Sequence, residues 1–256
     1  MKLRALKIAA PVVLLAAVSL FAADFWETKE FTQWTEKECR ELLTKSPWAF
    51  SNAFGDLPPM MVGENQNMPD VRTGGLRGQG QPTTFGESQN TIVFEFRLLA
   101  AQPIRMALGQ LQMLRSPEDR AVEQQVRANI EAPTVKDIVV QISYRTVPTG
   151  SSSVHDIHSF FLHANLATFT TNTYLEGGSR KNIALTGYLP PDANRSNPAF
   201  LFPRFDDAGA PMFTGAEKSL TMRSEFTPEI RGRRQKYNIF VRMKPKDMHF
   251  KGALAL

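Results

Sequence analysis

The sequence predicts an α+β protein: an N-terminal capped helix and a flexible linker, followed by one domain of antiparallel strands packed with two or three helices. Residues 91–97 and 136–145 alternate between apolar and polar side chains, which is the period of a half-buried strand. Between them lie two segments whose apolar residues recur at the helical period. Short alternating runs follow residue 190. A strand, a helical pair and then a meander is the order typical of an α+β fold.

The first predicted helix spans residues 36–45 and carries a clear start signal. Thr35 takes the N-cap position and Glu38 the third helical position, which is the spacing of a capping box. Pro47 restricts the residue before it to extended geometry, so the helix ends there. Its few apolar residues cannot stabilise it alone, so it must pack against another part of the protein. We therefore interpret residues 24–54 as an aromatic helical segment.

The composition changes sharply between Gly55 and Asn90. This stretch is rich in glycine, proline, glutamine and asparagine and contains few apolar residues. Such a chain cannot bury enough apolar surface to offset its conformational entropy. We predict a flexible linker over residues 55–90, with a functional lid as the alternative.

Three helices are predicted in the domain that follows, residues 91–256. The first covers residues 103–114, where a proline occupies the first turn. The second covers residues 117–132 and has Ser116 as its N-cap, with acidic residues near the positive end of its dipole. The third covers residues 155–171 and ends before the glycine pair at 177 and 178. The apolar face of the first helix consists of Ile104, Ala107, Leu108, Leu111 and Leu114.

Strands make up most of the remaining domain. After a proline pair at 190 and 191, the last two of four short strands are separated by the polar turn Lys244–Asp247. We expect these two to pair with each other as a hairpin. The four strands are predicted at 199–205, 218–226, 236–243 and 247–255.

The N-terminus predicts export. Three basic residues precede an uncharged apolar run that ends in small residues, so residues 1–23 have the pattern of a secretory signal peptide. The small residues favour cleavage near Ala22, or alternatively after Ser19. As a helix the apolar run spans about 24 Å, which is short for a membrane span, and an uncleaved anchor is the alternative. We expect a periplasmic or extracellular protein.

The composition excludes several function classes. Without the three basic residues of the leader, the chain has 27 basic and 25 acidic residues and a net charge of +2. A near-neutral exported protein is not expected to bind nucleic acid. One cysteine cannot form an intramolecular disulfide, so the core must hold the fold. No second apolar stretch reaches membrane-spanning length, so membrane contact is expected only through an uncleaved leader.

Three of the four histidines fall within nine residues. On a helix, His155 and His158 lie one turn apart and could share a metal ion, with Asp156 nearby. His163 projects from a different side, and the chain lacks a His-Glu-x-x-His motif. The other interpretation is a polar helix face beside a phenylalanine-rich one. We assign no metal or cofactor and keep a metal-dependent hydrolase that uses His155, Asp156 and His158 as the alternative.

Residues 231–236 form a short basic run between two predicted strands. From Glu217 to Lys251 there are ten lysines and arginines against four acidic residues. A polyanion of the cell envelope could bind there, with an affinity that falls as the salt concentration rises. The other interpretation is an ordinary solvated loop.

The other candidates lack the partners that catalysis requires. The serines at 151–153 have no Gly-x-Ser-x-Gly elbow, and acidic neighbours disfavour a reactive thiolate at Cys39. Asp206 and Asp207 precede a glycine in a pattern typical of a turn. The glycines of residues 74–80 follow no predicted strand and precede no helix, so they do not predict a phosphate-binding loop. We assign no catalytic residue.

The order of segments resembles a family of exported bacterial proteins. Residues 25–38 read FWETKEFTQWTEKE and are followed by Ser46-Pro47-Trp48-Ala49; Phe202-Pro203-Arg204 and the sequence KPKDMHFKGALAL over residues 244–256 come later. In this order the chain is similar to the GWxTD-domain-containing proteins, although the Gly-Trp-x-Thr-Asp motif itself is absent. The resemblance implies export and this order of segments. The family has no established activity, so the resemblance implies no catalytic residue.

We therefore expect an exported, non-enzymatic binding or structural module of the cell envelope, with an envelope protein or a polyanion as partner. Two roles are open for the aromatic residues of segment 24–54. They close over the core of the domain, because aromatic side chains bury large areas, or they anchor a partner. These residues are Trp26, Phe31, Trp34 and Trp48.

Overall fold

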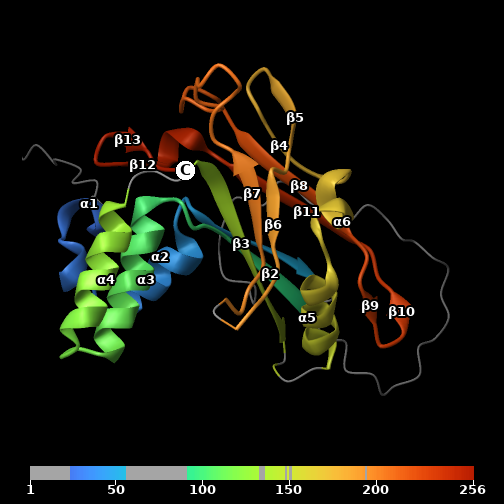
Figure 1. Cartoon of the computed structure of the whole chain (residues 1–256), viewed down its shortest axis with the longest axis horizontal. Coiled ribbons are helices and arrows are strands. Elements are labelled where there is room, and N and C mark those ends of the chain that lie inside the picture. Colours follow the sequence, from blue (N-terminus) through green and yellow to red (C-terminus); the bar gives the residue numbers. More distant parts are fainter. Residues whose placement is uncertain (1–23, 56–90, 133–135, 148, 150–151, 194) are drawn as a thin grey trace, which may run out of the picture.

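The computed structural model describes residues 24–55, 91–132, 136–147, 149, 152–193 and 195–256. Within these ranges the chain has the predicted α+β fold, in which two antiparallel sheets pack together and helices lie at one end and along one side (Figure 1). The predicted signal peptide, nearly all of the predicted linker and the glycines of 74–80 lie outside the described residues. No described helix is both long and apolar enough to cross a membrane.

The larger sheet is built from β1 (Ala49–Phe54), β2 (Thr91–Leu98), β3 (Asp137–Val147), β7 (Ala199–Pro203) and β6 (Gly187–Leu189), in this order across the sheet. All its neighbouring strands are antiparallel. Three of them confirm strands predicted from the alternation of side chains. β6 and β1 were missed. β1 ends the segment interpreted as helical and pairs along its own whole length with β2, from Ala49 opposite Arg97 to Phe54 opposite Ile92.

The smaller sheet has the order β11 (Tyr237–Met243), β8 (Leu220–Phe226), β4 (Thr173–Gly177) and β5 (Arg180–Ala184). β8 and β11 confirm predicted strands, whereas the hairpin of β4 and β5 was missed. Of the glycine pair expected to end a helix, Gly177 is the last residue of β4 and Gly178 begins the turn of this hairpin, with a φ of +58°. Glycine reaches this left-handed conformation without steric cost, which explains its presence in the turn.

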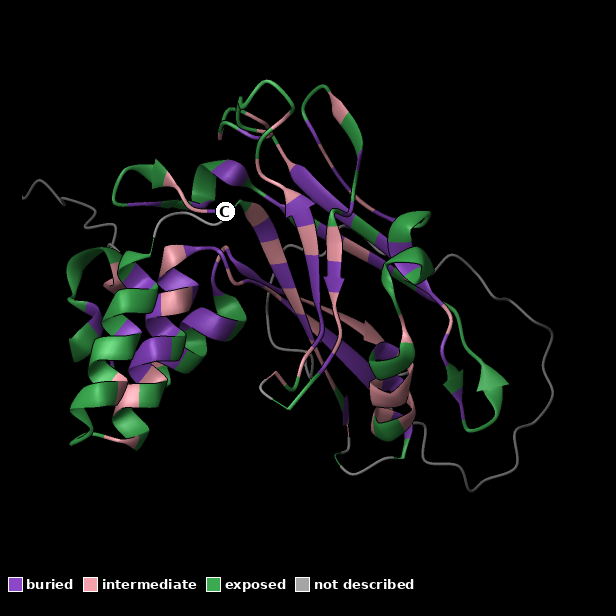
Figure 2. Cartoon of the chain, viewed as in Figure 1, coloured by how far each residue is buried: buried purple, intermediate pink, exposed green. Residues whose placement is uncertain are grey.

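The core between the two sheets is aromatic. Phe94 of β2 lies edge-to-face with Phe226 and Tyr237 of the smaller sheet, with ring centroids 5.4 and 5.1 Å apart. Phe54 makes the same kind of contact with Phe94 and Tyr237. Figure 2 shows buried residues along the strands of both sheets. This geometry places the positive edge of one ring against the negative face of the next and stabilises the packing of the sheets.

A layer of helices covers one end of the sheets (Figure 1). Its elements are α1 (Phe25–Thr28), η1 (Phe31–Gln33), α2 (Glu36–Lys45), α3 (Gln102–Arg115) and α4 (Arg120–Glu131). The capping box of α2 is confirmed, because the Thr35 side chain accepts from the Glu38 amide while Glu38 accepts from the Thr35 amide. α3 packs between α2 and α4. A Cβ on Gly109 would lie 2.5 Å from Cγ1 of Val126, so α3 and α4 approach too closely for a side chain there.

The start of α4 was predicted too early. Its N-cap is Asp119, whose side chain accepts from the amides of Ala121 and Val122 at 2.9 and 3.2 Å. Ser116 instead follows the last residue of α3. Both residue types favour N-caps, and here the aspartate satisfies two free amides at once.

The predicted apolar face of α3 is partly wrong. Ile104 and Ala107 are buried, but Leu108 and Leu114 are 39% and 45% exposed. Gln110 is buried in their place, and its Nε2 donates to the backbone carbonyls of Thr32 and Trp34 at 3.0 Å each. The N-terminal segment thus covers a face of α3 that hydrophobic periodicity does not reveal.

The helix predicted over residues 155–171 is two helices, α5 (Ser153–His163) and α6 (Leu166–Thr170). Ala164 is extended, and Asn165 caps α6 by accepting from the Thr168 amide. This break points Phe161 of α5 and Phe169 of α6 into the same core, where both are fully buried and stacked 6.2 Å apart.

The hairpin predicted between residues 236–243 and 247–255 does not form. β11 pairs with β8 along all seven of its residues, and the chain then turns through η3 (Pro245–Asp247). The last residues make their own short hairpin, β12 (His249–Phe250) with β13 (Ala253–Leu254). β11 forms a complete ladder of hydrogen bonds with β8, and this pairing outweighs the local turn signal at residues 244–247.

The N-terminal segment is docked on the domain. Trp34 and Trp48 are 1% and 0% exposed, and the Trp48 indole donates to the backbone carbonyl of Ala255 at 2.7 Å. The Arg97 guanidinium of β2 donates to the carbonyl of Leu43 at 2.8 Å. Phe31 is also buried, whereas Trp26 is half-buried. These aromatic residues close over the core, so three of the four rings offer no surface to a partner.

The capping box predicts how acid affects stability. The Lys29 ammonium, followed by the Thr35 amide, lowers the pKa of Glu38 from 4.5 to about 2. A lowered folded-state pKa adds stability that is complete above pH 4.5 and disappears as the pH falls toward 2. We expect Glu38→Gln to destabilise the protein at neutral pH by up to about 1 kcal/mol, because the ion pair is partly exposed.

Urea unfolding at a series of pH values measures this effect. The difference between wild type and Glu38→Gln should shrink as the pH falls below 4.5. Glu41→Gln on the same helix is the control, since Glu41 is exposed and outside the capping box. A constant difference across the pH range would contradict the assignment to Glu38.

Candidate functional site

The histidine cluster does not converge on one point. His155 is exposed, while the ring of His158 bonds through Nδ1 to the Tyr144 hydroxyl at 2.7 Å. Nδ1 of His163 bonds to the backbone carbonyl of Ser159 at 2.8 Å. The Asp156 carboxylate accepts from the Arg231 amide at 3.0 Å. His158 and Asp156 are thus engaged in contacts that hold α5 to its neighbours.

No group of three or more histidine, cysteine, aspartate or glutamate residues is placed to hold a metal ion in the described part of the chain. A groove of about 380 Å³ beside α5 includes Asp156, Ser159 and His163 in its lining, but neither His155 nor His158. The set of ligands that motivated the metal-dependent hydrolase is therefore not assembled in one cavity.

The basic run forms a hairpin, β9 (Glu229–Ile230) with β10 (Arg233–Arg234). Its turn residues Arg231 and Gly232 have φ values of +50° and +74°, the pattern of a two-residue hairpin turn. Arg233 and Arg234 are exposed, and Lys236 pairs with Glu225 at 2.6 Å. This hairpin packs on α5 and keeps an exposed basic tip.

Of the other candidates, Cys39 and Asp206 have structural roles. Cys39 is fully buried, and burial, followed by the nearby Glu38 carboxylate, raises the pKa of its thiol to about 11. Such a thiol is not a nucleophile. Asp206 forms the predicted turn, accepting from the amides of Ala208 and Ala210, and the Arg180 guanidinium at 2.9 Å lowers its pKa. Ser153 is buried at the start of α5, and Ser151 lies outside the described residues.

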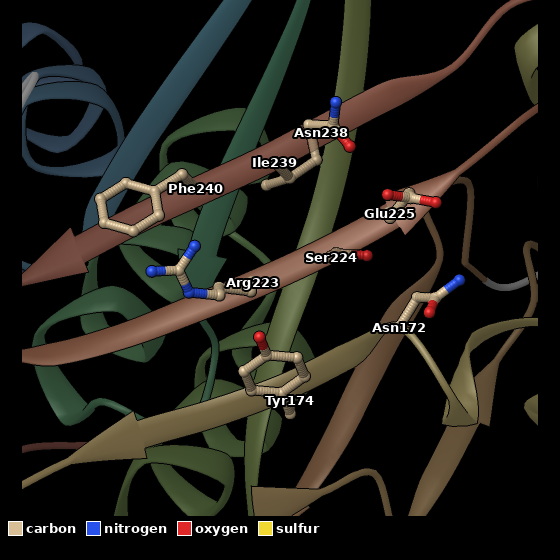
Figure 3. Close-up of a pocket in the computed structure, with 8 residues that line it drawn as sticks. All are labelled: Asn172, Tyr174, Arg223, Ser224, Glu225, Asn238, Ile239 and Phe240. Atoms are coloured by element: carbon tan, nitrogen blue, oxygen red, sulfur yellow. The ribbon is translucent and has the colours of Figure 1, made fainter. Parts of the chain in front are cut away.

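A different site lies on the solvent-facing side of the smaller sheet. Here a groove of about 300 Å³ crosses β4, β8 and β11 (Figure 3). We call it the outer groove. It lies opposite the core, because the residues that alternate with its side chains, Leu175, Met222 and Val241, are buried. Its lining consists of Asn172, Tyr174, Arg223, Ser224, Glu225, Asn238, Ile239 and Phe240.

The centre of the outer groove is a row of three side chains on three neighbouring strands. Arg223 of β8 lies opposite Tyr174 of β4 on one side and opposite Phe240 of β11 on the other. Its guanidinium carbon lies 4.8 Å from the centre of the Phe240 ring, a cation–π contact. Tyr174 and Phe240 are half-exposed, so both rings reach solvent.

A second, polar row runs beside the first (Figure 3). Glu225 lies opposite Asn238, and its amide bonds to the backbone carbonyl of Asn172 at 3.0 Å, which places Asn172 at the other end of the row. Both asparagines are exposed. Within the described chain, their side-chain amides and the Tyr174 hydroxyl make no hydrogen bond. These groups are therefore free to donate to and accept from a ligand.

The charges of the outer groove are balanced in pairs. Arg223 donates through Nε to Glu176 at 3.2 Å, and Lys236 lies 2.6 Å from Glu225. Each pair joins neighbouring parts of the sheet and neutralises one charge with another. The groove consequently presents aromatic faces and amides rather than a field of one sign.

Sequence reasoning did not identify the outer groove. The alternation of buried and exposed residues in β8 and β11 places Arg223, Glu225, Asn238 and Phe240 on the outward face, so part of the signal was available. Tyr174 was hidden because β4 was not recognised as a strand. Above all, the rows depend on which strands pair and in which register, and neither follows from the spacing of residues along one strand.

Comparisons with known proteins do not assign this chain to a family. No family model and no solved structure matches it. One stretch of 96 residues is 36% identical to the glutamyl aminopeptidase of Bos taurus. The match covers 36% of this chain and 10% of the bovine protein. A likeness over so small a part of that enzyme carries no activity to this chain.

Proposed function

We propose that this protein is an exported, non-enzymatic binding module of the cell envelope that holds its ligand in the outer groove. Export is supported by the signal-like residues 1–23 and by the resemblance to exported bacterial proteins. The observation that carries the binding role is the row of Tyr174, Arg223 and Phe240. It exposes two aromatic rings and a guanidinium on paired strands, which hold binding groups more rigidly than loops do.

The chemistry of the outer groove favours binding over catalysis. General acid–base catalysis needs a titratable side chain that is free to transfer a proton. Among the described residues that line the groove, the one carboxylate is Glu225, which pairs with Lys236. The Ser224 hydroxyl is buried and bonds to the Thr173 hydroxyl at 2.8 Å. Neither group is placed to act as a base or a nucleophile.

Co-sedimentation with purified bacterial envelope fragments tests this proposal. We expect the wild-type protein to sediment with the fragments, and the double variant Tyr174→Ala/Phe240→Ala to bind at least about tenfold more weakly, since each truncation removes an exposed contact surface. Phe205→Ala is the matched control, because Phe205 is also an exposed aromatic residue but does not line the groove. Circular dichroism checks that all variants are folded.

Equal sedimentation of the wild type and the double variant would overturn the assignment to the outer groove. Loss of binding in Arg233→Ala/Arg234→Ala together with a steep salt dependence would place the site on the tip of the β9–β10 hairpin and make the partner a polyanion. Failure of the wild type to sediment would overturn the envelope-binding role.

A further inference from the structure

We infer that the ligand of the outer groove is a neutral glycan chain. This inference rests on the proposed function and names the ligand class of the same site. It draws on three properties of the groove: the placement of its aromatic rings, the free amides beside them, and the balance of its charges.

The aromatic rings suit the apolar faces of sugar rings. One face of a pyranose ring carries a patch of C–H groups, which pack against the flat face of an aromatic side chain. Tyr174 and Phe240 lie on the two strands that flank β8. Neighbouring strands are about 4.8 Å apart, so these two residues are separated by roughly 10 Å along the row. That separation allows an extended chain to contact Tyr174 with one sugar ring and Phe240 with another, although the Arg223 guanidinium covers one face of the Phe240 ring.

The polar row suits the hydroxyl groups of a sugar. Each hydroxyl both donates and accepts a hydrogen bond, and a side-chain amide does the same from adjacent atoms. Asn172 and Asn238 expose such amides at the two ends of the row, and the Tyr174 hydroxyl adds a third free group. A glycan that lies across β4, β8 and β11 can therefore stack on the first row while its hydroxyls bond to the second.

The balance of charges selects a neutral chain. A polyanion would meet the carboxylates of Glu176 and Glu225, and a polycation would meet Arg223 and Lys236. A neutral glycan is repelled by neither the acidic nor the basic groups, and it can form hydrogen bonds to the paired charged groups without separating them. The volume of about 300 Å³ is at the lower end of ligand pockets and accommodates a few sugar rings rather than a folded partner.

Isothermal titration of the full-length mature protein with soluble oligosaccharides tests this inference. The probes are neutral oligomers of glucose and of N-acetylglucosamine, with polygalacturonate as the polyanion and a lysine oligomer as the polycation. We expect at least one neutral series to bind with little dependence on salt, because no net charge is neutralised. We expect Kd to rise at least about tenfold in Tyr174→Ala and in Asn238→Ala, and to stay unchanged in Phe205→Ala.

Tyr174→Phe separates stacking from hydrogen bonding, and it should weaken binding less than Tyr174→Ala does. Binding of a charged oligomer in preference to every neutral one would overturn the inference. The inference would also be overturned if no neutral oligosaccharide bound while sedimentation with envelope fragments still depended on Tyr174. In that case the proposed function would stand, with a ligand of a different class. Loss of both kinds of binding would overturn the inference and the proposed function together.

Discussion

A chain that lacks residues 24–54 is expected not to fold. The deletion removes edge strand β1 and helix α2, and it leaves the amide of Gln110 without the carbonyls of Thr32 and Trp34. The deletion also exposes to water the surfaces of α3 and β2 that the segment covers, and a domain is stable by only about 5–15 kcal/mol in total. The buried apolar side chains that are lost are Phe31, Trp34, Cys39, Leu42, Leu43, Trp48 and Phe50.

The expected signs are the absence of a cooperative thermal transition by circular dichroism and exposure of apolar surface to a dye such as ANS. Trp48→Ala in the full-length chain is a milder version of the same experiment. It should cost about 3–5 kcal/mol, because Trp48 is fully buried and its indole bonds to the carbonyl of Ala255. Trp26→Ala, at a half-buried position, should cost less. A shortened chain as stable as the full one would contradict this structural role, and if it had also lost co-purifying partners, segment 24–54 would be an interaction arm.

Phe94→Ala is expected to destabilise the protein by about 3–5 kcal/mol. Phe94 is fully buried and lies at the centre of the interface between the sheets, where its ring contacts those of Phe54, Tyr144, Phe226 and Tyr237. Truncation leaves a cavity that the rigid sheets cannot close, and several edge-to-face contacts are lost at once. Urea unfolding should show a lower midpoint with an unchanged slope, since the surface exposed on unfolding hardly changes.

Phe240→Ala is the matched control for this measurement. This variant also truncates a phenylalanine, but on the opposite side of the smaller sheet, where Phe240 is half-exposed and contacts the Arg223 guanidinium. We expect a loss of about 0.5–1 kcal/mol, the value of an exposed cation–π contact. If Phe94→Ala prevents folding, Phe94→Leu gives a smaller and measurable loss. A cost below about 1 kcal/mol for Phe94→Ala would show that the sheets do not depend on this aromatic core.

Elements with a strong local signal were predicted well. The capping box of α2 depends on two side chains three residues apart, and β2 and β3 depend on alternation within one strand. Some errors arose where two local signals competed, as at Ser116 and Asp119, and another arose where a distant strand outweighed a nearby turn, as at β11.

The outer groove shows the same division. The sequence alone determines that β8 and β11 carry charged, amide and aromatic side chains on one face, because alternation along a strand is a local property. Only the tertiary structure decides that Tyr174, Arg223 and Phe240 stand in one row, because strands from distant parts of the chain must pair in one register. The tertiary structure likewise decides that Trp34 and Trp48 are buried in the core, since burial depends on what packs against a residue. The sequence therefore determined the local elements and the signal-like N-terminus, and the tertiary structure decided which side chains meet.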